Sequence, residues 1–274
     1  MARTADSELA SLWLDALDGR PAALEERLAS DSRLPGPRAN LELAHRTADC
    51  AAATPDGRRR DALRLLDRWL QAGRGAEPGE PEPATEARRE YLAAVAALCV
   101  GALVSVRPDD DAAALLTTAT SDRRWRVREL AATGLQRVLA ADPERGMRLV
   151  RLWLVSGMLP ARAAVAAVAE PSLLRDRDTA QAAVRVVEQA ADRLLALPSG
   201  ERRAADPRVL RQALGYAVSV VAAADPAAGL PLLERLATST DPDARWIARE
   251  NLKKARLAPY ADRLAVARDA LSRA

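Results

Sequence analysis

The chain has 274 residues, of which 49% are hydrophobic and 29% are charged, a balance typical of a soluble globular protein with one large or two modest domains. The net charge of +3 is too small to indicate a general nucleic-acid-binding protein. The longest apolar run, residues 92–106, is too short and alanine-rich for a membrane span, and the acidic N-terminus does not resemble a secretory signal. We therefore expect a cytoplasmic protein without a membrane partner. The scarcity of lysine and the absence of phenylalanine indicate a GC-rich bacterial genome.

The first 72 residues favour three or four helices, which we expect over 6–17, 21–29, 38–53 and 58–71. We interpret residues 1–72 as an N-terminal helical extension or as capping repeats, because terminal repeats are often atypical where one face meets water. The segment 73–85 that follows is rich in Pro, Gly and Glu and has no apolar periodicity. It predicts an exposed loop.

Nearly every segment from residue 86 to residue 274 predicts a helix. Asp-Pro pairs mark several helix starts, because Asp caps free amide groups and Pro fits the first helical position. We expect five helix pairs: 86–106 with 108–119, 122–140 with 143–156, 159–169 with 178–197, 207–224 with 226–238, and 242–256 with 259–272.

A short pattern recurs through these pairs. An aliphatic residue precedes an arginine, apolar residues follow two and three places later, and the arginines are 34, 49 and 34 residues apart. A unit of this length is typical of stacked helix pairs, so we predict an all-α, right-handed solenoid. We expect the arginines to reach carbonyl or Asp groups in an adjacent turn and so to link neighbouring repeats. These arginines are Arg128, Arg162, Arg211 and Arg245.

A second alignment of the pattern stays open, because residues 124–129 resemble residues 245–250. This alignment pairs Arg128 with Arg249 in place of Arg245. In either alignment Trp125 and Trp246 lie in a first helix near a turn, where a Trp packs between repeats or stacks on a ligand. We favour inter-repeat packing for both.

The stretch 122–135 resembles the first helix of a HEAT repeat, with a capping Asp122, then Val127-Arg128, then an alanine-rich stretch that ends in Leu135. Residues 241–252 carry the second copy. The resemblance to the HEAT-repeat (α-solenoid) family covers about residues 86–274. It implies an array of HEAT-like antiparallel helix pairs with a curved surface that binds proteins or, less often, nucleic acid.

A weaker likeness is to the bacterial alkylpurine DNA glycosylases built from HEAT-like repeats. The stretch 125–128 resembles one of their helices, and residues 214–217 followed by Asp225-Pro226 weakly resemble another. The helix expected to carry the family's Asp has none over 89–95, and the two matching stretches lie too far apart. The likeness therefore assigns no catalytic residue.

No catalytic, cofactor-binding or metal-binding constellation stands out. His45 is the only His, and Cys50 and Cys99 lack metal-ligand spacing. We therefore expect a non-enzymatic interaction or scaffold protein that presents a curved helical surface to a protein partner, with DNA binding as the alternative. Three arginines that step by three along one predicted helix, followed by a Trp, are the candidates for the binding surface. They are Arg145, Arg148, Arg151 and Trp153.

Overall fold

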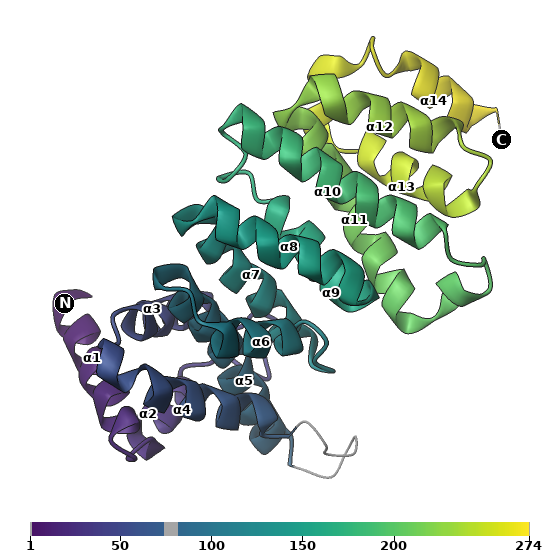
Figure 1. Cartoon of the computed structure of the whole chain (residues 1–274). Coiled ribbons are helices and arrows are strands. Elements are labelled where there is room, and N and C mark those ends of the chain that lie inside the picture. Colours follow the sequence, from purple (N-terminus) through teal and green to yellow (C-terminus); the bar gives the residue numbers. More distant parts are fainter. Residues whose placement is uncertain (1, 74–81, 274) are drawn as a thin grey trace. The chain divides into compact units, whose positions relative to one another are not determined.

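A computed structural model describes residues 2–73 and 82–273, and within these ranges the chain is all-helical, without a strand (Figure 1). The prediction of an all-α chain is confirmed for these residues. The chain divides into two compact units, residues 1–146 and 147–274. The core of the predicted loop, residues 74–81, lies outside the described ranges.

The first unit is built from α1 to α7 and the start of α8 (Figure 1). Successive contacts join α1 to α3, α3 to α5 and α5 to α7, while α2, α4 and α6 pack against this row. The helices are α1 (Ala2–Leu17), α2 (Ala22–Ser30), α3 (Leu41–Ala52), α4 (Arg59–Gln71), α5 (Pro83–Val106), α6 (Asp110–Ala119), α7 (Trp125–Ala141) and α8 (Pro143–Ser156).

The apolar run of the sequence is the central helix of this unit. By length and composition α5 would be able to cross a membrane, but residues 91–104 are buried against α3, α4 and α7. A helix that is apolar on all sides is expected at the centre of a helical core. Gly101 of α5 meets Gly134 of α7 where the two helices cross. The missing side chains let the backbones approach closely.

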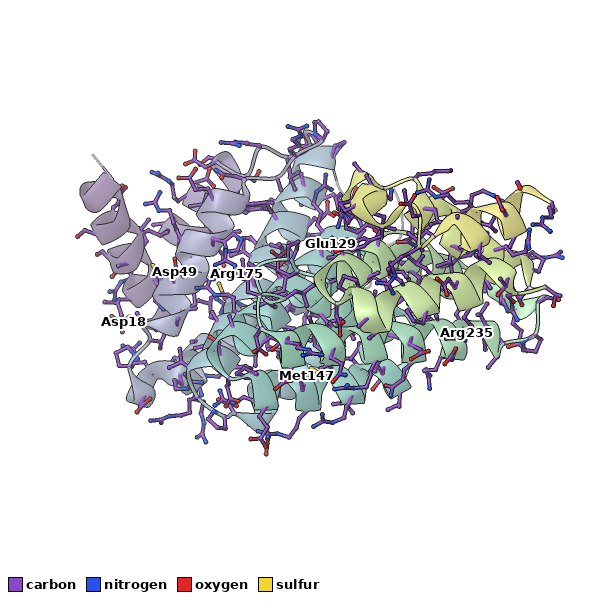
Figure 2. All side chains as sticks on the ribbon, turned by 90° about the horizontal axis from the view of Figure 1, so that it is seen from above. Asp18, Asp49, Glu129, Met147, Arg175 and Arg235 are labelled. Carbon is purple, nitrogen blue, oxygen red and sulfur yellow. The ribbon has the colours of Figure 1, made fainter. Side chains whose placement is uncertain are left out.

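The second unit contains the remaining helices (Figure 1). Contacts join α9 to α11 and α11 to α13 in one row, and α10 to α12 and α12 to α14 in another. Arg235 of α12, labelled in Figure 2, reaches Glu188 and Asp192 of α10 at the surface. The helices are α9 (Met158–Val168), α10 (Arg177–Leu195), α11 (Ala205–Ala224), α12 (Pro226–Thr238), α13 (Pro242–Leu252) and α14 (Ala265–Ser272).

Most Asp-Pro pairs mark helix starts as predicted. Asp142, Asp225 and Asp241 each accept hydrogen bonds from backbone N–H groups of the first turn that follows. The start predicted near Asp206 is wrong by two residues, because α11 already begins at Ala205. Pro207 is tolerated there because the N–H groups of a first turn have no intrahelical acceptor.

The last predicted helix, 259–272, also needs correction. Residues Ala255–Tyr260 form a short 3-10 helix, and α14 begins only at Ala265. Pro259 lies inside this 3-10 helix, and turns over residues 261–264 separate it from α14.

The recurring arginines do not all occupy one position in their helices. Arg128 and Arg245 are each the fourth residue of their helix, whereas Arg162 is the fifth residue of α9 and Arg211 the seventh of α11. The helix starts therefore favour the alignment of Arg128 with Arg245, since Arg249 lies one turn further along α13. Arg211 is displaced because α11 starts with an additional turn.

Candidate functional site

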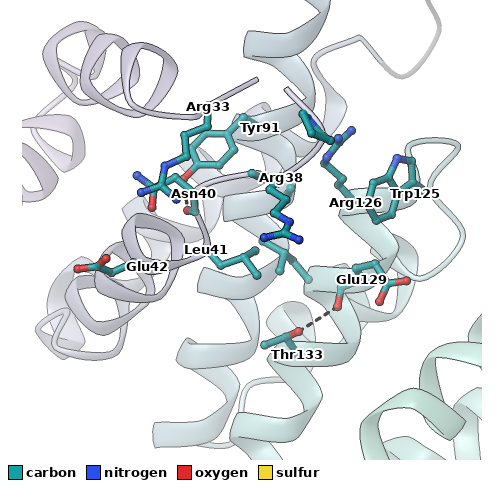
Figure 3. Close-up of a pocket in the computed structure, with 14 residues that line it drawn as sticks. Arg33, Arg38, Asn40, Leu41, Glu42, Tyr91, Trp125, Arg126, Glu129 and Thr133 are labelled. Atoms are coloured by element: carbon teal, nitrogen blue, oxygen red, sulfur yellow. Dashed lines mark hydrogen bonds between the residues drawn. The ribbon is translucent and has the colours of Figure 1, made fainter. Parts of the chain in front are cut away.

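A mainly apolar pocket of about 560 Å³ opens in the first unit (Figure 3). It lies between the 31–40 segment, the first turn of α3, and the facing sides of α5 and α7. The apolar side chains of Leu41, Ala94 and Leu130 line it together with the ring of Tyr91. Its volume falls in the range of ordinary ligand and side-chain binding sites.

Hydrogen bonds fix the 31–40 segment internally and attach it to the start of α3. Ser32 is 2% exposed; its hydroxyl accepts a hydrogen bond from the N–H of Leu34, and its carbonyl accepts one from the N–H of Asn40. The Asn40 side chain caps α3 by accepting from the N–H of Leu43 at 3.1 Å. The backbone of the segment is therefore fixed where its side chains line the pocket.

Tyr91 links this segment to the central helix. Its hydroxyl donates a hydrogen bond to the carbonyl oxygen of Asn40 at 2.6 Å, and its side chain is 1% exposed. Burial raises the pKa of Tyr91 above its ordinary value. The phenol therefore remains a protonated donor throughout the physiological range.

Trp125 begins α7 at the edge of the pocket and is 52% exposed. The guanidinium of Arg126 lies 4.5 Å from the centre of its ring. Arg126 also pairs with Glu90 at 3.0 Å and donates to the carbonyl of Gly36 at 3.4 Å. These contacts hold one face of the pocket wall and leave much of the indole accessible (Figure 3).

Trp246, the other predicted inter-repeat Trp, has a different environment. Its ring lies against Gly215 of α11, where a Cβ would approach it to 2.9 Å, and Arg211 stacks on it at 3.8 Å from the ring centre. Arg211 also pairs with Asp243 at 2.6 Å. The contacts of Trp246 and Asp243 on α13 with Gly215 and Arg211 on α11 therefore join these two helices.

The other recurring arginines contact backbone carbonyls or lie partly buried. Arg128 donates to the carbonyls of Asp122 and Arg123 in the turn before its own helix. Arg245 donates to the carbonyls of Ala237 at 3.3 Å and Ala270 at 2.9 Å, at the ends of α12 and α14. Arg162 is half-buried on α9.

Two arginines that were not predicted from the sequence bind helix ends more extensively. Arg124 donates to the carbonyls of Leu70 and Ala72 at the end of α4, each at 2.7 Å. Arg202 donates to the carbonyls of Leu195 and Leu197 at the end of α10. Each also pairs with an Asp near a helix start, Asp122 or Asp241. The two-residue spacing of Asp122 and Arg124, just before a helix start, was the sequence signal that would have pointed to Arg124.

The predicted binding surface on α8 is wrong for two of its four residues. Trp153 is fully buried, and Arg145 pairs with Asp142 at 2.8 Å and donates to the carbonyl of Val104 at 2.6 Å. Arg148 and Arg151 are both exposed. A step of three residues falls short of a full helical turn, so this series rotates from the interior towards solvent.

A second cluster of exposed aromatic and cationic groups lies in the second unit. Tyr216 of α11 is 50% exposed. The guanidinium of Arg256 lies 4.6 Å from its ring centre and donates to its hydroxyl at 2.7 Å, and the ammonium of Lys254 lies 5.5 Å from the ring centre. This cluster is compatible with an anionic partner.

The side chains with acid–base or nucleophilic chemistry, His45 and Cys99, lie apart from the pocket. Burial, and secondarily the charge of Arg137, lower the pKa of His45, and burial raises the pKa of Cys99. Neither residue lines the pocket. Among the side chains that the structure describes, no group of His, Cys, Asp and Glu has the arrangement needed to hold a metal ion.

Comparison with known proteins gave no match: neither a family model, nor a curated protein, nor a solved structure is significantly similar to this chain.

Proposed function

We propose that the chain is a non-enzymatic interaction protein whose first unit binds a protein partner at the pocket between α3, α5 and α7. The observation that carries this proposal is an apolar pocket with a half-exposed Trp and arginines at its edge. Trp and Arg are the residue types that most often dominate protein interfaces. An exposed indole at the mouth of a preformed pocket suits an apolar side chain of a partner.

We further propose that the helices form a HEAT-like α-solenoid. Support comes from the contact rows within each unit, in which alternate helices pack together: α3, α5 and α7 in the first unit, and α9, α11 and α13 in the second. Helix pairs of this kind bury their apolar faces against neighbouring pairs. The outer faces of one row of helices can then contact a partner.

We expect Trp125→Ala to reduce recovery of the protein partner by about tenfold, because truncating a central interface Trp removes both apolar contact and shape. The measurement is affinity capture from a lysate of the native cells, with quantification of the proteins retained by the wild-type and variant chains. Tyr216→Ala is the matched control, since Tyr216 is a similarly exposed aromatic residue, 50% against 52%, in the other unit. Equal partner recovery with wild-type chain and Trp125→Ala would contradict the proposal.

DNA binding is the alternative, favoured by the cluster of Tyr216, Lys254 and Arg256 in the second unit. Aromatic rings among cations suit stacked bases and phosphates. The alternative requires an electrophoretic shift of plain or alkylated duplex at low salt, steeply weakened by added salt and by Tyr216→Ala. The absence of any shift at low salt would eliminate it.

A further inference from the structure

Two arginines at the edge of the pocket carry uncompensated charge. Arg33 and Arg38 are both exposed, and neither forms an ion pair with any residue that the structure describes. Most other arginines in the first unit have such a partner, as Arg126 has Glu90 and Arg58 has Asp61. A pair of unpartnered guanidinium groups beside an apolar pocket indicates a partner that supplies negative charge.

The backbone presents these two side chains from a fixed segment. Arg33 has a φ of +63°, a left-handed conformation that residues other than Gly rarely adopt. Hydrogen bonds hold it there: the N–H of Gly36 donates to the carbonyl of Arg33, and Ser32 and Asn40 fasten the two ends of the segment. Unusual backbone conformations that are held in this way occur often at binding sites. The arginines thus lose little backbone freedom on binding.

The carboxylates beside the pocket do not cancel this charge. Glu129 already takes part in another interaction, and Glu42 is exposed and also borders a neighbouring cavity. Figure 3 draws these two residues at opposite sides of the pocket, with Arg38 between them. The guanidinium groups of Arg33 and Arg38 therefore outnumber the one carboxylate, Glu42, that has no ion-pair partner among the described residues.

We propose that the pocket recognises an acidic segment of a partner protein, in which a large apolar side chain is flanked by Asp or Glu. The apolar side chain enters between Trp125, Leu41 and Leu130, and the flanking carboxylates pair with Arg33 and Arg38. Bidentate pairing fixes the register of the segment, and burial of the anchor side chain supplies most of the affinity. This inference rests on the proposed function and adds the chemistry of the partner.

The test uses short fluorescein-labelled peptides that hold one Leu or Trp flanked by Glu, with matched peptides flanked by Gln or by Lys. Fluorescence anisotropy measures their affinity for the full chain. We expect the Glu-flanked peptides to bind about tenfold more tightly than the Gln-flanked ones and the Lys-flanked ones to bind most weakly. Arg33→Gln and Arg38→Gln should each weaken binding of the Glu-flanked peptides about fivefold and reduce its salt dependence.

Arg60→Gln is the matched control, because Arg60 is an exposed arginine of α4 outside the pocket. It should bind the Glu-flanked peptides as the wild-type chain does, and the thermal unfolding of all three variants should match the wild type. Equal affinity for Glu-flanked and Gln-flanked peptides, or no loss in Arg33→Gln and Arg38→Gln, would overturn the inference. If the peptide results overturned the inference but Trp125→Ala still reduced recovery of the partner from the lysate, the proposed function would stand without the acidic partner segment. A single-stranded oligonucleotide that bound as tightly and depended on the same arginines would also overturn it.

Discussion

Replacing Arg124 by Ala is expected to lower the free energy of unfolding by about 3 kcal/mol, because it leaves a buried carboxylate without its main partner. Asp122 is 2% exposed and receives two hydrogen bonds from the Arg124 guanidinium, each at 2.8 Å. The same guanidinium satisfies the carbonyls of Leu70 and Ala72 at the end of α4. The substitution therefore leaves these two carbonyls as unsatisfied acceptors and also weakens the pairing of the buried carboxylate.

Urea denaturation followed by circular dichroism measures this effect. Arg107→Ala is the control, since Arg107 and its partner Asp56 have 53% and 65% of their side-chain surfaces exposed. An exposed pair of this kind contributes about 0–1 kcal/mol. A similar small loss for Arg124→Ala would show that Arg124 does not stabilise the junction of α4 and α7.

Gly101→Ala is expected to destabilise the first unit by about 1–3 kcal/mol, although Ala favours helix formation by about 1 kcal/mol over Gly. A Cβ at residue 101 would stand 2.3 Å from the Cα of Gly134, so the backbones of α5 and α7 would have to separate. These two helices share the most extensive packing in the unit. The propensity gain is therefore smaller than the cost of separating the helices.

Thermal and urea unfolding of a graded series test this expectation. Gly134→Ala should cost less, because its Cβ would approach the Cα of Gly101 only to 3.1 Å. Gly57→Ala is the control, since a Cβ there meets no other atom within 4 Å. If Gly101→Ala were as stable as Gly57→Ala, the close crossing of α5 and α7 would not exist in solution.

The helices were largely predictable from the sequence, because their signals are local. Apolar periodicity marked nearly every helix, and capping by Asp142, Asp225 and Asp241 set three starts. These local signals misplaced helix boundaries where a proline is compatible with more than one local structure. Pro207 fits several positions of a first turn, so α11 begins earlier than predicted, and Pro259 lies in a 3-10 helix where the sequence predicted the start of the last α-helix.

The candidate site was much less predictable, because its residues meet only in the folded unit. Tyr91 and Trp125 lie on different helices, and Arg33 and Arg38 belong to a segment without periodicity. From the sequence, Trp125 was predicted to pack between repeats, and the binding surface was predicted on α8. Charge and helical spacing alone did not distinguish Arg145, which binds the end of α5, from an arginine that faces solvent.

Photocrosslinking in the native cells shows whether a protein partner occupies the pocket of the first unit. A photoreactive amino acid replaces either Leu41, a pocket residue that is 53% exposed, or Val266, which is 68% exposed on α14 of the second unit. If the partner binds there, we expect a discrete crosslinked protein from position 41 that is lost on Trp125→Ala, and no such product from position 266. The same product from both positions, or none from position 41, would contradict it.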